Sequence, residues 1–177
     1  MFIVAAAHGI ASLLLLALGA AIALRPKTRR ARHPQLGRIY AWTMPPVLVV
    51  GFVIGLQHWP SLSPFQIVVP PTIAAVCVGW FAASPSGRRR FGPRWLSVHI
   101  QAMGGSLIAL STGFGFQVAA RAGAPIDEPL ITVVLFAVPT IIGSPIIGRA
   151  IAARGLARVA QAQPGPGPLG AQQTTGA

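Results

Sequence analysis

The chain has 177 residues and a formal net charge of +12, with 53% hydrophobic and 9% charged residues. Soluble domains carry about 25% charged residues, so this composition excludes an ordinary soluble domain and indicates an all-α, multi-pass membrane protein. Asp127 and Glu128 are its only acidic residues, which excludes any mechanism that needs a carboxylate within the membrane.

The first predicted membrane span covers residues 2–24, a continuous apolar run. A secretory signal begins with a basic segment, and this run has none before it. Instead, Arg25, Lys27, Arg29 and Arg30 follow it at once. Basic flanks are retained in the cytoplasm, so we expect an uncleaved span whose N-terminus lies outside.

The second span is predicted over residues 39–56, after a strongly basic loop. Pro34 suits the first position of a helix, where its missing N–H costs nothing. This would make His33 the residue that caps the helix. Pro45 and Pro46 lie within the span and remove backbone hydrogen bonds, which predicts a kink.

The third span is predicted over residues 65–83, where Pro70 and Pro71 indicate a bend. Small side chains allow membrane helices to approach closely. This span carries such a seam at helical spacing, made of Thr72, Ala75, Gly79 and Ala82. A second basic turn, residues 84–94, then leads into the next span.

The fourth span, residues 95–120, is too polar and too rich in small residues for a passive lipid-facing anchor. At steps of three and four residues, one of its faces collects His99, Met103, Ser106, Leu110, Gly113 and Gln117. Lipid offers these groups no partners, so we expect this face to turn toward the other helices. The fourth span is therefore predicted to be the centre of the bundle.

The fifth span is predicted over residues 129–147, interrupted by Pro139 and Pro145. Residues 149–158 form a basic amphipathic extension suited to the membrane surface. Residues 161–177 are rich in Pro, Gly, Gln and Thr and lack the apolar side chains that build a core, which predicts disorder. We therefore expect one transmembrane domain, residues 1–160, and a disordered tail.

The basic residues predict how the chain is threaded. Of the 14 Lys and Arg, all except Arg121 fall on one side of the membrane under this span assignment. The positive-inside rule then places the N-terminus outside and the C-terminus in the cytoplasm of a bacterial inner membrane. Because the basic residues flank apolar spans, we expect them to contact anionic lipid headgroups and not nucleic acid.

The four histidines are sorted by depth under this topology. His8 and His58 fall in the outer half, and His33 and His99 in the inner half. A haem b held by two histidines needs both at one depth on facing helices. His33 and His99 meet that condition, whereas His8 with His58 is a weaker pair.

Two arginines complete the candidate haem site. Arg38 and Arg94 lie close in sequence to His33 and His99, respectively, and are candidate contacts for the haem propionates. Cys77 is the only cysteine, which excludes a thiolate zinc site within one chain.

Two further interpretations stay open beside the haem site. The histidines can instead be structural, hydrogen-bonding neighbouring helices in a non-enzymatic or accessory bundle. A small-molecule permease is the other alternative, with kinks at Pro45, Pro70 and Pro139. Its cavity would be lined by Thr43, Ser106 and Gln117. The sequence contains no Walker loop, no GxSxG elbow and no HExxH motif, so we lean away from an enzyme.

Three patterns carry a resemblance to a known family. The first is His8 near the start of span one, and the second is His33-x-x-x-Gly37-Arg38-x-Tyr40-x-x-x-Met44. The third is Trp95-x-x-x-His99-Ile100-x-x-Met103-x-Gly105-Ser106-x-Ile108-Ala109-x-x-Thr112-x-Phe114. Up to about residue 116, the chain resembles the bacterial predicted membrane proteins grouped as domain of unknown function 2306. It departs from their pattern at Pro34, usually basic, and at Gly113, commonly Ala.

The resemblance implies a membrane-embedded helical bundle, and no established activity comes with it. It implies that His8, His33 and His99 are the positions where a function should be tested. Any link to haem-binding bundles of the cytochrome b561 type is an analogy of fold.

Overall fold

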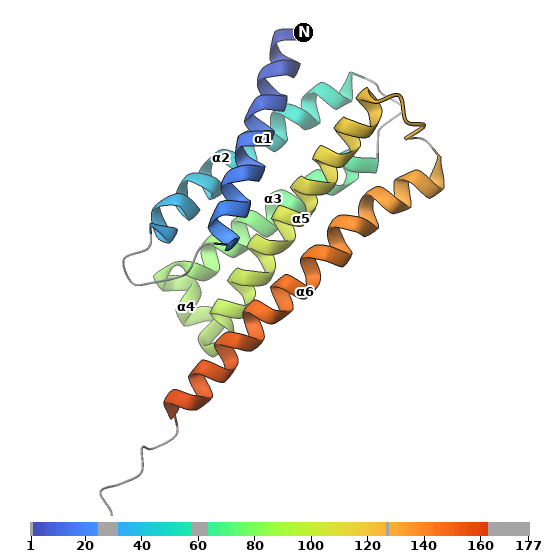
Figure 1. Ribbon diagram of the computed structural model, residues 1–177. Coiled ribbons are helices and arrows are strands. Elements are labelled where there is room, and N and C mark those ends of the chain that lie inside the picture. Colours follow the sequence, from blue (N-terminus) through green and yellow to red (C-terminus); the bar gives the residue numbers. More distant parts are fainter. Residues whose placement is uncertain (1, 25–31, 58–63, 127, 163–177) are drawn as a thin grey trace, which may run out of the picture.

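The computed structural model describes residues 2–24, 32–57, 64–126 and 128–162. All regular secondary structure in these ranges is helical, and the long helices lie side by side in one bundle (Figure 1). The elements are α1 (Phe2–Leu24), α2 (His33–Leu56), α3 (Pro64–Ala83), α4 (Pro85–Phe91), a 3-10 turn η1 (Gly92–Arg94), α5 (Trp95–Arg121) and α6 (Pro129–Ala162).

Five of these helices, α1, α2, α3, α5 and α6, are long and apolar enough to cross a membrane. The predicted all-α fold with five helices able to span a membrane is therefore confirmed, and this architecture fits a multi-pass membrane protein. Helices suit this setting because they satisfy every backbone polar group within one segment. The helices continue through Pro45, Pro46, Pro70 and Pro71, so these prolines do not end a span.

The start of α2 differs from the prediction. The helix begins at His33, with Arg32 as its N-cap, and no side chain caps it. His33 is thus the first residue of the helix and Pro34 is the second, so His33 does not cap the helix. The helix reaches back from residue 39 to His33, which places the His33 ring on the helix itself.

The basic turn after α3 contains a short helix, α4, that the sequence analysis did not predict. Ser84 caps it by accepting a hydrogen bond from the Gly87 N–H at 3.1 Å. Gly87 is buried against the end of α3, and a Cβ there would meet the Phe81 carbonyl oxygen. Gly92, at a φ of 53°, then ends α4, a conformation that glycine adopts without strain.

Helix α6 is a single helix of 34 residues, so the predicted extension after residue 147 continues the fifth span without a break. In Figure 1 its C-terminal part projects past the other helices. The helix ends at Ala162, and the tail predicted to be disordered lies almost wholly outside the described residues.

Helix α5 lies at the centre of the bundle, packed against α1, α3, α4 and α6. Its buried residues are Ser106, Leu110, Thr112, Gly113 and Phe116. The predicted inward face is thus correct at Ser106, Leu110 and Gly113, with Met103 packed against the core, but wrong at Gln117, which is exposed.

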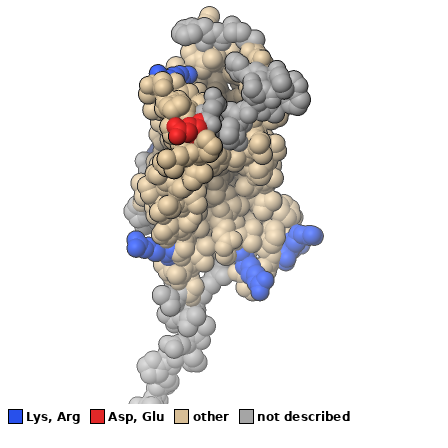
Figure 2. Space-filling view, turned by 90° about the vertical axis from the view of Figure 1, so that its right-hand side faces the viewer, with Lys and Arg blue, Asp and Glu red and all other residues tan. Residues whose placement is uncertain are grey.

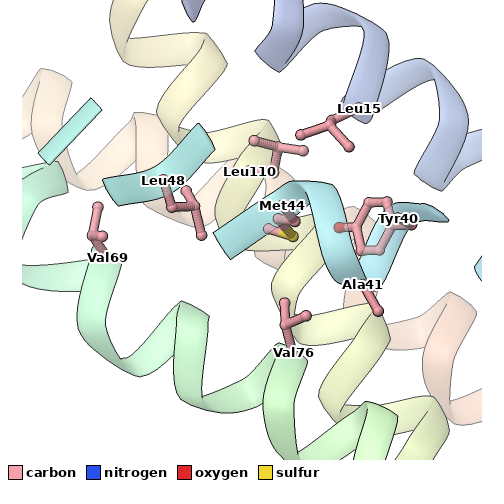
Figure 3. Close-up of a cluster of buried hydrophobic side chains, with 8 residues drawn as sticks. All are labelled: Leu15, Tyr40, Ala41, Met44, Leu48, Val69, Val76 and Leu110. Carbon is pink, nitrogen blue, oxygen red and sulfur yellow. The ribbon is translucent and has the colours of Figure 1, made fainter. Parts of the chain in front are cut away.

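The hydrophobic core lies where α1, α2, α3 and α5 meet (Figure 3). Met44 is fully buried at its centre, flanked by Tyr40 and Leu48 on α2. Helix α3 contributes Val69 and Val76, and Thr72, Gly79 and Ala82 of its predicted seam are buried. Large side chains from α2 therefore fill the space that the small residues of α3 and α5 leave.

Charged side chains are segregated along the bundle. Figure 2 shows Lys and Arg gathered at one end, with a separate basic patch and the acidic residue toward the other. Arg154 shares a groove with Pro93 at the start of α5, whereas Arg121 lies near Gly9 of α1 at the opposite end. Among the described residues, this matches the separation of Arg121 from the other arginines that the sequence predicts.

Candidate functional site

The strongest cluster of functional groups is the pair formed by His33 and His99. Their ring centroids lie 6.5 Å apart and their planes are nearly perpendicular, at 81°. His33 opens α2, and His99 lies one turn into α5, so two helices far apart in sequence bring the rings together. The sequence analysis placed both at one depth, and the structure brings them into one site.

His99 is fixed in position by α3. Its Nδ1 lies 2.8 Å from the carbonyl oxygen of Gly79. A carbonyl can only accept a hydrogen bond, so Nδ1 carries the proton and Nε2 carries the lone pair of the neutral ring. Histidines that bind metals commonly donate their other N–H in this way, which fixes the tautomer and the orientation of the ring.

Gly79 makes this arrangement possible. A Cβ at Gly79 would lie 2.8 Å from Met103 Sδ and 3.2 Å from Ala102 Cβ, so a side chain would push α3 away from α5. The close approach of the two backbones keeps the Gly79 carbonyl within reach of His99. The small-residue seam found in the sequence thus positions a histidine as well as packing two helices.

Helix α2 reaches α5 through side chains, whereas its backbone lies close to α1 and α3. The distance between α2 and α5 is larger, and two pairs of side chains bridge it. These pairs are His33 with His99 and Tyr40 with Ser106. One turn beyond His33, a Cβ at Gly37 would meet nothing within 4 Å. Gly37 therefore has open space beside it, on the same helix as His33.

The residues present fit a two-histidine haem. With a metal–imidazole bond of ~2.0 Å, two axial rings have centroids about 6 Å apart. The observed 6.5 Å agrees with that separation. Within the described residues, no cluster of three or more His, Cys, Asp or Glu could hold a bare metal ion.

The other predicted site residues lie apart from this pair. Arg38 and Arg94 are both exposed, and their contact with haem propionates stays a prediction. His8 is half-buried on α1, with its ring against Gly51 of α2. Gly51 is about 27 Å along α2 from His33, at ~1.5 Å per residue, so His8 does not join the His33 and His99 pair. His58, its predicted partner, lies outside the described residues.

A buried polar contact that the sequence analysis missed lies deeper between α2 and α5. Tyr40 Oη lies 3.3 Å from Ser106 Oγ, and the Ser106 hydroxyl also donates to the Met103 carbonyl at 2.8 Å. Both side chains were noted separately, and only their facing positions in three dimensions reveal the contact.

The side chains proposed to line a permease cavity are dispersed. Ser106 has no exposed surface, whereas Thr43 and Gln117 are exposed. Thr43 Oγ1 donates to the Ile39 carbonyl of its own helix at 2.7 Å. The cavity of the permease alternative stays a prediction.

Comparison of the chain with protein-family models, with curated proteins and with solved structures finds no match. The functional interpretation therefore rests on the side chains of this chain and on their geometry.

Proposed function

We propose that this protein is a membrane-embedded haem b protein that transfers electrons, with His33 and His99 as the axial ligands. The observation that carries the proposal is the pairing of two imidazoles from different helices, 6.5 Å apart, with His99 oriented by the Gly79 carbonyl. Ionisable side chains within membrane spans are costly and usually serve a function. Two ionisable side chains at one site are harder to explain by helix packing alone than a single one.

The residues of the chain would do three things at this site. The Gly79 carbonyl holds the His99 proton on Nδ1, so that Nε2 keeps the lone pair for iron. His33, at the start of α2, supplies the second imidazole. The apolar side chains of the core, such as Met44 and Leu48, exclude water from the adjoining interior. Haem b would supply a reversible one-electron exchange.

The proposed orientation follows from the charge segregation. With the arginine-rich end in the cytoplasm, the N-terminus lies outside, and the His33 and His99 pair lies toward the cytoplasmic face of a bacterial inner membrane. Membership of the domain of unknown function 2306 family is part of the same proposal, since both histidines fall within the patterns that resemble it. Arg38 and Arg94 would then contact the propionates from that face.

A visible absorption spectrum tests the proposal. We expect the full chain, purified from cells supplied with a haem precursor, to show a Soret band whose α and β bands sharpen on reduction with dithionite. His99→Ala and His33→Ala should each abolish the low-spin spectrum, because one imidazole cannot hold the iron six-coordinate. His8→Ala removes a histidine about 27 Å from the site and should leave the spectrum unchanged.

Two results would count against the haem proposal. One is a folded, helical protein with no Soret band under these conditions. The other is a spectrum that survives in the double variant H33A/H99A. In either case the histidine pair would be a packing element of an accessory bundle.

A further inference from the structure

A small groove lies between α5 and α6 at the arginine-rich end of the bundle. It has a volume of about 130 Å³ and is lined by Pro93, Leu96, Ser97, Ile100, Ile151, Arg154 and Gly155. A single water needs only ~10–15 Å³ of such volume. The groove is therefore large enough for a polar group of several atoms.

Arg154 differs from the other arginines. Every other arginine whose side chain the structure describes is exposed, namely Arg32, Arg38, Arg88, Arg89, Arg90, Arg94, Arg121 and Arg149. Arg154 alone among them is half-buried, and its side chain forms part of the groove wall. A partly desolvated guanidinium favours an anionic partner, and it binds phosphate oxygens with two parallel hydrogen bonds.

The described residues around the groove provide no carboxylate for this guanidinium. The only described acidic side chain is Glu128, just before α6 and at the opposite end of the bundle from Arg154. No described acidic side chain thus balances the Arg154 charge.

The remaining walls show what kind of anion fits. Leu96, Ile100 and Ile151 are apolar, and Ser97 adds a hydroxyl. These apolar walls lie directly beside the Arg154 guanidinium. A molecule with an anionic head and a hydrocarbon chain would match the guanidinium and the apolar walls together.

The depth of the groove agrees with such a molecule. Trp95 starts α5 beside the groove, and the Arg88 guanidinium stacks on its ring at 4.4 Å. Tryptophan and arginine gather at the level of lipid headgroups. The groove thus opens at the height where a phospholipid phosphate lies.

We propose that this groove binds an anionic phospholipid of the surrounding bilayer, such as phosphatidylglycerol. Its phosphate would lie on Arg154 and Ser97, and one acyl chain along Leu96, Ile100 and Ile151. This goes beyond the proposed haem function, because the groove lies between α5 and α6, and its test does not depend on haem.

Native mass spectrometry of the detergent-purified full chain tests the proposal. The protein is titrated separately with phosphatidylglycerol, phosphatidylcholine and inorganic phosphate. We expect phosphatidylglycerol to bind about tenfold more tightly than phosphatidylcholine, because the choline ammonium of phosphatidylcholine offsets the charge of the phosphate that both lipids carry. Inorganic phosphate should neither bind nor compete at equal concentration.

Two pairs of variants locate the binding. Arg154→Gln removes the charge, and its control, Arg149→Gln, removes an exposed arginine on the same helix. Gly155→Leu fills the groove, and its control, Gly148→Leu, makes the same change at another open position of α6. We expect R154Q and G155L to weaken phosphatidylglycerol binding about tenfold, and both controls to bind like the wild type.

Either replacement of glycine by leucine favours helix formation, so both variants should fold. Circular dichroism of the four variants checks this. Equal binding of the two lipids would overturn the proposal, as would equal losses in R154Q and R149Q. Competition by inorganic phosphate would show a general anion site and would also overturn it.

Discussion

At the scale of single residues, the site depends on two backbone carbonyls, one on α3 and one on α5. The Gly79 carbonyl holds His99, and the Met103 carbonyl holds the Ser106 hydroxyl. In both cases a backbone oxygen orients a side chain that faces α2. Backbone oxygens thus fix His99 and Ser106, and Tyr40 in turn contacts the Ser106 hydroxyl.

Tyr40→Phe tests the contact between Tyr40 and Ser106. Ser106 keeps its bond to Met103, so no buried hydroxyl is left unpaired, and we expect a loss of only about 0.5–1.5 kcal/mol. Unfolding in mixed micelles of increasing SDS fraction measures this loss. Thr43→Ala, at an exposed hydroxyl on the same helix, should change stability less.

Ser106→Leu changes the other side chain of this contact and makes it larger. It places a large side chain where no surface is exposed, and overpacking of this kind costs about 1–3 kcal/mol. A Tyr40→Phe variant less stable than Ser106→Leu would contradict this account of the interior.

The histidine pair shows how far residue-level patterns can predict a site. The prediction that His33 and His99 share one depth came from charge and span order, and the structure brings the rings together. The Gly79 contact could not be predicted in the same way. It depends on the rotation of α3 about its axis, which the hydrophobic pattern of a lipid-surrounded helix does not specify.

At the scale of elements, α5 and α6 pack through two reciprocal contacts. Ile147 of α6 lies over Gly104 of α5, and Ile108 of α5 lies over Gly143 of α6. A Cβ at either glycine would come within 2.6 Å of the isoleucine Cδ1 opposite. Each glycine thus accepts one large side chain, as expected for helices that associate by close packing in lipid.

We expect Gly143→Leu to loosen α6 from α5, because the Ile108 side chain would have to leave its place. Hydrogen exchange measured by mass spectrometry should show faster exchange in α6 and little change in α1 or α2. Gly148→Leu, where a Cβ meets nothing within 4 Å, is the matched control. Equal exchange in the two variants would show that the glycine contact does not hold the helices together.

The long helices could be predicted, because a run of about 20 apolar residues has the length that a helix needs to cross a bilayer. Helix α4 could not, because seven residues carry too little periodicity. The signal was nevertheless present, since Ser84 followed by Pro85 is a typical helix start. The four arginines of residues 84–94 give this stretch the composition of a turn, which obscures the helix start.

At the scale of the whole molecule, the arginines divide the bundle into two chemically different ends. The described arginines near the starts of α2 and α5 lie with Arg154 at one end, and Arg121 lies at the other. The proposed haem and lipid sites both lie toward the arginine-rich end. The orientation of the bundle in the membrane therefore decides from which compartment both sites are reached.

Reporter fusions test the orientation. An enzyme that is active only outside the cytoplasm should be active when fused after Gly123, which follows α5, and inactive when fused after Gly92, which precedes it. The reverse pattern would place both proposed sites on the outer face. Substituting the arginines of residues 88–94 with Gln should weaken the preference for one orientation.

The attachment of α6 to α5 has a consequence for biosynthesis. None of the residues in the most apolar stretch of α6 is buried, and α5 is its main neighbour. When α5 leaves the ribosome, α1 and α3 have already been made and can receive it. When α6 emerges, only α5 remains for it to pack against, so assembly can follow the order of synthesis. A chain truncated before residue 129 and released from the ribosome should already hold His33 beside His99.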